Sequence, residues 1–170
     1  MNERKPLQSP AGSAPPPVDP RAGKYLAFHL GIEEFGIAVS AVREIMGMQD
    51  ITAVPHTPAH VRGVLNLRGK VIPVIDLRLK FGLSAIEYTK RTSIIVVKVD
   101  DIMTGVIVDG VSEVLNLTGP EIDDTPDFGA GVTTPYLIGM AKAKGKVRML
   151  LDVDRVLNVS DFQSLGSLLQ

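Results

Sequence analysis

The feature that most constrains this chain is an internal repeat with an offset of 69 residues. The segment 36–45, Gly-Ile-Ala-Val-Ser-Ala-Val-Arg-Glu-Ile, aligns without a gap on 105–114, Gly-Val-Ile-Val-Asp-Gly-Val-Ser-Glu-Val. Residues 25–30 fall on 94–99 at the same offset, and the glycines, lysine, valine and aspartate of 63–76 fall on 139–152 at an offset of 76. Because the matching blocks keep their order, chance similarity explains them poorly, and we predict two structural repeats.

Short β-rich runs separated by Gly, Pro, Asp and Asn occupy most of the chain from residue 24 onward. The runs are 25–30, 35–39, 64–67, 71–77, 93–99, 105–108 and 147–153. Strands of this length with turn residues between them are typical of all-β sandwiches and barrels. Helices are expected to be few and brief, at 41–46, at 59–62 and near the C-terminus from Ser160. We therefore predict an all-β fold made of two similar small barrels.

Each repeat is short for a domain that folds alone. About 65 residues bury a smaller fraction of their surface than a longer domain does, so many domains of this size are not very stable. We expect the two barrels to pack tightly against each other. The seam between them is then a natural place for a binding groove.

The first 22 residues differ from the rest in composition. They hold six of the twelve prolines among Gly, Ser and charged residues, with almost no large apolar side chains. Such a segment cannot contribute to a core, so it is expected to be a solvated tail.

Composition excludes several classes of partner and compartment. The net charge of -1 offers no positive field for a nucleic acid, and aromatic residues make up only 5% of the chain. No apolar run approaches the roughly 20 residues that span a membrane, and the chain has no cysteine. We expect a cytoplasmic protein that inserts into no membrane and binds no nucleic acid.

Residues with catalytic potential form no recognisable site. His29, His56 and His60 match no metal or triad pattern, and Pro55 and Pro58 interrupt the helix that would bring two of them together. The acidic cluster around 121–127 lacks the alternating spacing of a calcium loop, and no phosphate-binding glycine motif occurs. We predict no catalytic residues, no cofactor and no metal, so the protein is not expected to be an enzyme.

Three stretches of the chain resemble one known family. They are 33–45, containing Glu-Glu-Phe-Gly-Ile and Val-Arg-Glu-Ile, then 57–78, containing Arg-Gly-Val-Leu-Asn-Leu-Arg-Gly-Lys-Val-Ile-Pro-Val-Ile-Asp-Leu-Arg, and finally 108–114, Val-Asp-Gly-Val-Ser-Glu-Val. In this order they are similar to the CheW family over about residues 24–158. We expect the stand-alone adaptor rather than the CheA or CheV form of this domain, because those forms carry further domains and 170 residues leave no room for them.

The resemblance implies both a fold and a function. The fold is two five-stranded SH3-like β-barrels, and the function is a chemotaxis adaptor that couples the cytoplasmic tips of methyl-accepting chemoreceptors to the histidine kinase CheA. A groove of the adaptor accepts the helical hairpin tip of a receptor, and other surfaces pair with the regulatory domain of CheA. Carried over by motif, the receptor-binding residues are Val42, Glu44, Asn66, Leu67 and Arg68.

Four of these residues also have a structural interpretation. Val42 and Leu67 could offer apolar contact to a helix or could pack in a core, and Glu44 and Arg68 could contact a receptor or each other. The repeat favours a binding role for the tip, since 66–69, Asn-Leu-Arg-Gly, aligns on 142–145, Lys-Ala-Lys-Gly, and a purely structural turn needs only its glycine. Gly63, Gly69 and Asp76 are assigned to structure.

The expected boundaries follow from the repeat and the resemblance together. The CheW-like domain is expected at 23–160, with a first barrel mainly at 31–90, a second mainly at 91–155 plus the strand 24–30, and a short helix or tail at 161–170. Arg148 stands where the family more usually has an apolar residue. A different kind of function remains as an alternative, namely a small-ligand or enzyme site in the seam between the barrels.

Overall fold

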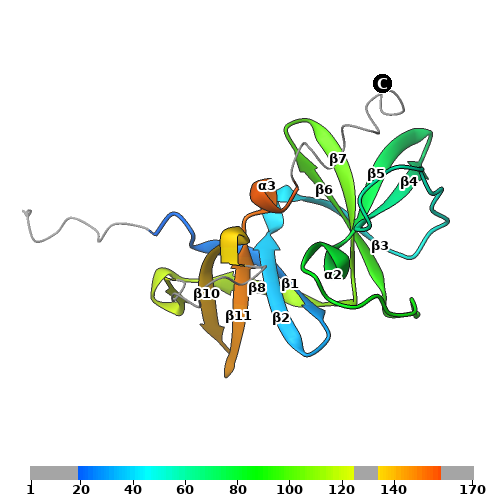
Figure 1. Ribbon diagram of the computed structural model, residues 1–170. Coiled ribbons are helices and arrows are strands. Elements are labelled where there is room, and N and C mark those ends of the chain that lie inside the picture. Colours follow the sequence, from blue (N-terminus) through cyan, green and yellow to red (C-terminus); the bar gives the residue numbers. More distant parts are fainter. Residues whose placement is uncertain (1–18, 125–133, 158–170) are drawn as a thin grey trace, which may run out of the picture.

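A computed structural model describes residues 19–124 and 134–157 of the chain (Figure 1). In these residues the fold consists of two β-sheets with a few short helical segments. One sheet has the strand order β8-β1-β2-β11-β10-β9 and the other the order β3-β6-β7-β5-β4. The prediction of an all-β fold is confirmed.

The strands are short, as the sequence indicates. Their bounds are β1 Gly23–Leu30, β2 Glu33–Ala38, β3 Val42–Gly47, β4 Val61–Leu67, β5 Lys70–Asp76, β6 Ser93–Val99, β7 Ile102–Val108, β8 Gly110–Leu117, β9 Ile122–Asp123, β10 Leu137–Ala143 and β11 Lys146–Leu151. The α-helices are α2 Leu77–Lys80 and α3 Val153–Val156, and 3-10 turns lie at Val39–Ala41, Gly119–Glu121 and Thr134–Tyr136. All seven expected runs are confirmed as strands.

Two of the expected helices are wrong. Residues 41–46 lie mostly in β3, where half-buried and exposed residues alternate along the strand and β6 provides the hydrogen-bonding partner. This period of two is the pattern of a strand rather than a helix. Residues 59–62 form a turn that runs into β4, and the expected C-terminal helix lies outside the described residues.

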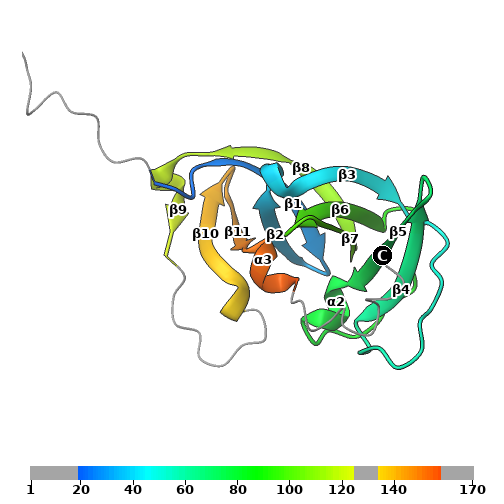
Figure 2. The ribbon, with the colours of Figure 1, turned by 90° about the horizontal axis from the view of Figure 1, so that it is seen from above.

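The two repeats exchange their first hairpins. The hairpin β1–β2 pairs with β8 and β11 of the second repeat, whereas the equivalent hairpin β6–β7 pairs with β3 and β5 of the first. In both sheets the contact of the hairpin's second strand with its host is parallel. Each sheet therefore needs strands from both halves of the chain, and Figures 1 and 2 show the two sheets side by side.

This exchange corrects the expected barrels. The sheets are open rather than closed, because the strands at the two ends of each sheet do not hydrogen-bond to one another as barrel closure requires. The sheets also differ from the expected division near residue 90. Strand β2 lies in the six-stranded sheet, and β6 and β7 lie in the five-stranded sheet with β3, β4 and β5.

Three hydrophobic clusters hold the fold together. One lies within the six-stranded sheet and one within the five-stranded sheet, centred on residues such as Leu150 and Val96. The third and largest contains residues of both sheets, among them Phe28, Phe35 and Ile95. The expected tight packing between the halves is therefore present as a shared core, and α3 lies at the junction (Figure 2).

Asp76 ends β5 and begins α2. Its carboxylate accepts hydrogen bonds from the backbone N–H groups of Arg78 and Leu79, which is the local bonding expected of this residue. The second carboxylate oxygen accepts the Tyr88 hydroxyl at 2.8 Å. Burial together with this hydrogen bond raises the pKa of Tyr88. Asp152 is the equivalent N-cap of α3 in the second repeat.

Gly63 has a structural role of a different kind from the one expected. It lies inside β4, at an irregularity in the pairing with β5, and not in a turn between strands. A Cβ added to it would lie 2.0 Å from the carbonyl oxygen of Thr52, and its φ is +139°. Only glycine lets the 52–53 segment approach this strand so closely.

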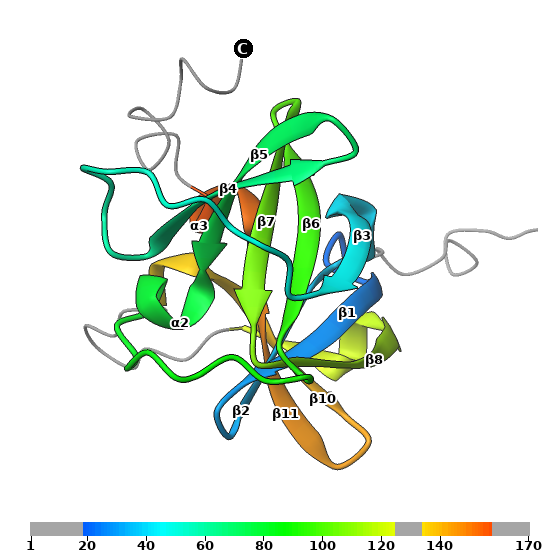
Figure 3. The same cartoon turned by 90° about the vertical axis from the view of Figure 1, so that its right-hand side faces the viewer.

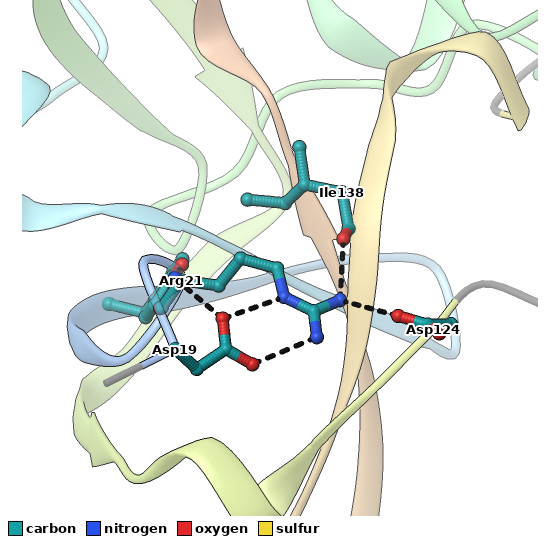
Figure 4. A network of polar contacts seen from close by, with 5 residues as sticks. Asp19, Arg21, Asp124 and Ile138 are labelled. Atoms are coloured by element: carbon teal, nitrogen blue, oxygen red, sulfur yellow. Dashed lines mark hydrogen bonds and ion pairs between the residues drawn. The ribbon is translucent and has the colours of Figure 1, made fainter. Parts of the chain in front are cut away.

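The residues just before β1 clasp the six-stranded sheet (Figure 4). The Arg21 guanidinium donates to both carboxylate oxygens of Asp19, to Asp124 at 3.2 Å and to the carbonyl oxygen of Ile138 at 3.1 Å. The Tyr25 hydroxyl donates to the carbonyl of Arg21 at 2.6 Å. The expected tail 1–22 therefore extends too far, because 19–22 belong to the folded part; residues 1–18 lie outside the described residues.

Candidate functional site

The candidate binding residues lie on two elements of the five-stranded sheet. Val42 and Glu44 are on β3, while Asn66, Leu67 and Arg68 are at the end of β4 and in the turn to β5. Strands β3 and β4 are the two end strands of this sheet. Curvature of the sheet brings the tip of the β4–β5 hairpin close to β3, as Figure 3 shows from the side of this sheet.

Glu44 and Arg68 form a bidentate ion pair across this gap. Arg68 Nη2 lies 2.5 Å from Glu44 Oε1, and Arg68 Nη1 lies 3.2 Å from Glu44 Oε2. The hydrogen bonds from Arg68 lower the pKa of Glu44, and the same bonds raise the pKa of Arg68. The Arg68 side chain is nevertheless 71% exposed, so much of it remains available to a partner.

A tight two-residue turn positions Arg68. Leu67 pairs with Lys70, so Arg68 and Gly69 alone connect the strands, with φ values of 51° and 87°. Two positive φ values in a row are those of a type I′ hairpin turn. Asn66 stabilises the turn, because its side-chain oxygen accepts the Gly69 N–H at 2.8 Å. The expected exposed turn is confirmed, and part of the role of Asn66 is structural.

Val42 and Leu67 are both half-buried but do not share a cluster. Val42 packs against the core shared by the two sheets, whereas Leu67 packs against the core of the five-stranded sheet. The structural interpretation of these residues is therefore correct in part. Of the five candidates, the structure joins Glu44 directly to Arg68 and links Asn66 to the same turn.

Two exposed apolar side chains near these residues were not identified from the sequence. Ile45 is adjacent to Glu44 in β3 and is 46% exposed, and Val71 pairs with Asn66 across the hairpin and is 38% exposed. Alternation in β3 could have revealed Ile45, but only after 41–46 had been recognised as a strand.

The second repeat has a matching pair. Lys144 occupies the same turn position as Arg68, with φ 55°, and its Nζ donates to Glu113 at 2.6 Å. Glu113 is the repeat equivalent of Glu44, and the hydrogen bond from Lys144 lowers its pKa. The two hairpin tips are therefore more alike than their sequences indicate, because each carries a cation that is paired with the glutamate at the equivalent position of its repeat. They differ in that arginine is a planar fork and lysine a point charge.

One cavity in the seam between the sheets is too small for a small-molecule ligand. The shared core leaves a cavity of about 20 Å³ there, lined only by apolar side chains such as Phe28, Leu77 and Val106. This is space for about one water molecule, whereas ligand sites measure some hundreds of Å³. The described geometry therefore does not favour the alternative of a ligand or enzyme site in the seam.

The search for other kinds of site can be reported for the described residues alone. Within 19–124 and 134–157 there is no group of three or more His, Asp or Glu side chains arranged to hold a metal. No helix in these ranges is long and apolar enough to cross a membrane.

Comparison with known proteins gives a consistent result. The family model described as the CheW-like domain matches residues 24–161. The chain is 38% identical to the chemotaxis protein CheW of Klebsiella aerogenes over 135 residues, which are 79% of this chain and 81% of that protein. It is also 38% identical to the chemotaxis protein CheW of Rhizobium meliloti over 131 residues, covering 77% of this chain and 84% of the relative.

A solved structure agrees with the fold. The scaffolding protein TtCheW from Thermoanaerobacter tengcongensis superposes with a TM-score of 0.75 at 32% identity, and the match covers 82% of this chain and 95% of that one. The likeness thus extends over nearly the whole of the described fold.

Proposed function

The chain belongs to the family of CheW-like domains, and we propose that it couples the cytoplasmic tips of methyl-accepting chemoreceptors to the histidine kinase CheA. Its relatives are chemotaxis proteins, and the structurally similar protein is described as a scaffolding protein. The role of this chain is accordingly that of a chemotaxis adaptor. The proposal adds the two partners and recruitment to receptor arrays at the membrane.

One observation carries the assignment of the receptor site: Arg68 is exposed yet held in place. A two-residue turn fixes its backbone, and the Glu44 carboxylate orients its guanidinium. A pre-oriented arginine loses little side-chain entropy on binding and can donate to a carboxylate or to exposed carbonyls at the tip of a helical hairpin. Arginines of this kind are frequent hot spots of protein interfaces.

Glu44 controls how a receptor can approach Arg68. Since two guanidinium nitrogens already bond Glu44, an incoming carboxylate must use the remaining donors or displace Glu44. A partner that brings its own cation beside Glu44 keeps the ion pair and adds to it. We therefore expect the receptor surface to carry both an acceptor for Arg68 and a donor for Glu44.

Apolar contact would come from the same elements. Val42 is half-buried, and Ile45 is 46% exposed on the same strand. Glu44 lies on the opposite face of β3 from these two side chains, so an amphipathic helix could meet all three and Arg68 only along the open edge of this end strand. The CheA regulatory domain would use a different surface, so that both partners can bind at once and each raises the local concentration of the other.

Co-sedimentation with receptor-containing membranes tests this proposal. We expect the protein to pellet with such membranes, and its presence to increase the amount of CheA that pellets with them. Membranes without receptors serve as the control. If the protein pellets equally with both membranes, or if CheA recovery does not depend on it, the proposed coupling is wrong.

A further inference from the structure

The exchange of hairpins poses a problem of assembly, because both hairpins present the same backbone to their hosts. Strand β2 pairs in parallel with β11 through Gly36 and Leu150, and β7 pairs in parallel with β5 through Gly105 and Val74 (Figure 1). These residues are equivalents in the two repeats. Backbone hydrogen bonds and the glycine position therefore do not determine which sheet a hairpin joins.

Side chains two residues earlier do differ between the sheets. In the five-stranded sheet Ile72 of β5 is buried in a cluster against which Met103 of β7 packs. The equivalent positions in the six-stranded sheet are Arg148 of β11 and Glu34 of β2. Apolar packing of hairpin and host in one common cluster is thus replaced by an ionic contact in the other sheet.

The ionic contact is well satisfied. Arg148 is 1% exposed, and its Nε donates to Glu34 Oε1 at 2.8 Å. Its Nη1 donates to the carbonyl of Ala143 at 3.3 Å, and its Nη2 lies 3.7 Å from Glu113 Oε2. Lys146 donates to the second Glu34 oxygen at 3.1 Å. The buried guanidinium thus depends on the β1–β2 hairpin for its shortest hydrogen bond.

We propose that the Glu34–Arg148 ion pair selects the sheet that each exchanged hairpin joins. If the β1–β2 hairpin paired with β5 of its own repeat, Glu34 would face the apolar Ile72. If the β6–β7 hairpin paired with β11, Met103 would leave Arg148 buried without Glu34. Arg148 would then keep only the Ala143 carbonyl and the more distant Glu113 as partners, and a buried charge that loses its best partner is unfavourable, so each wrong pairing is disfavoured.

This role concerns specificity rather than stability. Replacing a buried ion pair by apolar residues of similar size is often neutral or stabilising, whereas removing one partner is not. The pair therefore does not have to strengthen the correct fold in order to act. Its effect is to raise the free energy of the wrongly paired arrangements above that of the correct fold. In those arrangements a hairpin pairs with the wrong host sheet, either within one chain or between two chains.

The double variant Glu34→Met with Arg148→Ile tests the proposal, because it gives both sheets the same apolar contact. After refolding from denaturant, we expect the wild type to give one set of backbone amide NMR signals and one monomer peak in gel filtration. The double variant should give a second set of signals, or a dimer, at about 10% of the total or more. Its main species should unfold at a temperature close to that of the wild type.

A single species in the double variant, as homogeneous as the wild type, would overturn the proposal. Should this variant fail to fold, Glu34→Gln with Arg148→Met provides the same test with side chains closer in shape to the originals.

Discussion

Arg68 and Lys144 provide a matched comparison at the level of single residues. Both are exposed turn cations with positive φ, and both are paired with equivalent glutamates. We predict that Arg68→Ala lowers receptor affinity about thirtyfold, because truncation removes a pre-oriented donor. Lys144→Ala should have much less effect, and Arg68→Lys should restore binding only in part because it lacks the planar fork.

Receptor binding and thermal unfolding of these variants together separate the possible roles of Arg68. The unfolding temperature of Arg68→Ala should lie within about 3 °C of the wild type, because the pair is exposed. If Arg68→Ala unfolds far below the wild type, the residue is structural. If the Arg68 and Lys144 variants bind receptor equally well, the receptor-site assignment is incorrect.

Glu34 makes the stability of the protein depend on pH. Burial acts to raise the pKa of Glu34, but hydrogen bonds from Lys146 and Arg148 outweigh it and hold the pKa below the ordinary value of 4.5. A lowered pKa in the folded state contributes stability above pH 4.5 that is lost as the pH falls through the folded value. The unfolding temperature should therefore fall on acidification.

The variant Glu34→Gln isolates this contribution. It cannot titrate and leaves Arg148 without an anionic partner at its Nε, so it should unfold at a lower temperature than the wild type near neutral pH. The difference should narrow as the pH drops below about 4.5, and melts across this range would measure it. Parallel curves for the two proteins would show that Glu34 is not the titrating group. Glu44 and Glu113 also have lowered pKa values, so some pH dependence should remain.

At the level of elements, the clasp before β1 sets the true start of the fold. Deleting 1–18 should leave the unfolding temperature nearly unchanged, because this segment lacks large apolar residues other than Met1, Leu7 and Val18. Deleting 1–22 should lower it by about 5 °C, since Arg21 then no longer bridges Asp124 and Ile138. Arg21→Ala should reproduce most of this loss, with Lys24→Ala as the control for an exposed cation nearby.

Equal unfolding temperatures for the two deletions would show that the clasp contributes nothing. The sequence could not reveal this clasp, because its partners lie more than 100 residues away along the chain. Proline content correctly identified a segment unable to form a core, but composition alone cannot locate a boundary to within four residues. Asp124, in the acidic cluster, accepts from Arg21 although its side chain is 95% exposed.

Element types were predictable where the local pattern was strong. The run 93–99, Ser-Ile-Ile-Val-Val-Lys-Val, indicates a strand regardless of context, and β6 has these bounds. The segment 41–46 was misassigned because its good helix formers outweighed a short alternation. Pairing with β6, a contact between residues about 50 positions apart, determines its state. Such contacts are absent from any local window.

At the level of the whole molecule, the repeat predicted two equivalent units but not how they combine. Comparing the sequence with itself shows which strands are equivalent. It does not show whether a hairpin pairs with strands of its own repeat or of the other repeat, because equivalent strands have the same hydrophobic pattern in either arrangement. Of the Glu34–Arg148 ion pair, the sequence showed only an unusual arginine. The role of Arg148 depends on Glu34, which contacts it only in the folded protein.

The exchange predicts that neither half folds alone. A fragment 24–91 loses β6 and β7 from its sheet, and its β1–β2 hairpin loses both neighbours. It should show no cooperative thermal transition by circular dichroism and poor dispersion of its amide NMR signals. Mixing it with a fragment 92–170 should restore both, because each sheet is then complete. A cooperative transition of 24–91 alone would contradict this account of the fold.

The central claim is that one protein joins receptor and kinase through separate surfaces, and a titration of receptor-dependent CheA phosphorylation tests it most directly. As adaptor is added to fixed receptor and CheA, we predict that phosphorylation rises to a maximum and falls in excess, when separate adaptor molecules occupy the two partners. Arg68→Ala should bind CheA normally but give little receptor-dependent phosphorylation at any concentration, whereas Lys144→Ala should retain it. Phosphorylation that does not respond to the adaptor, or that Arg68→Ala supports as well as the wild type, would contradict the account.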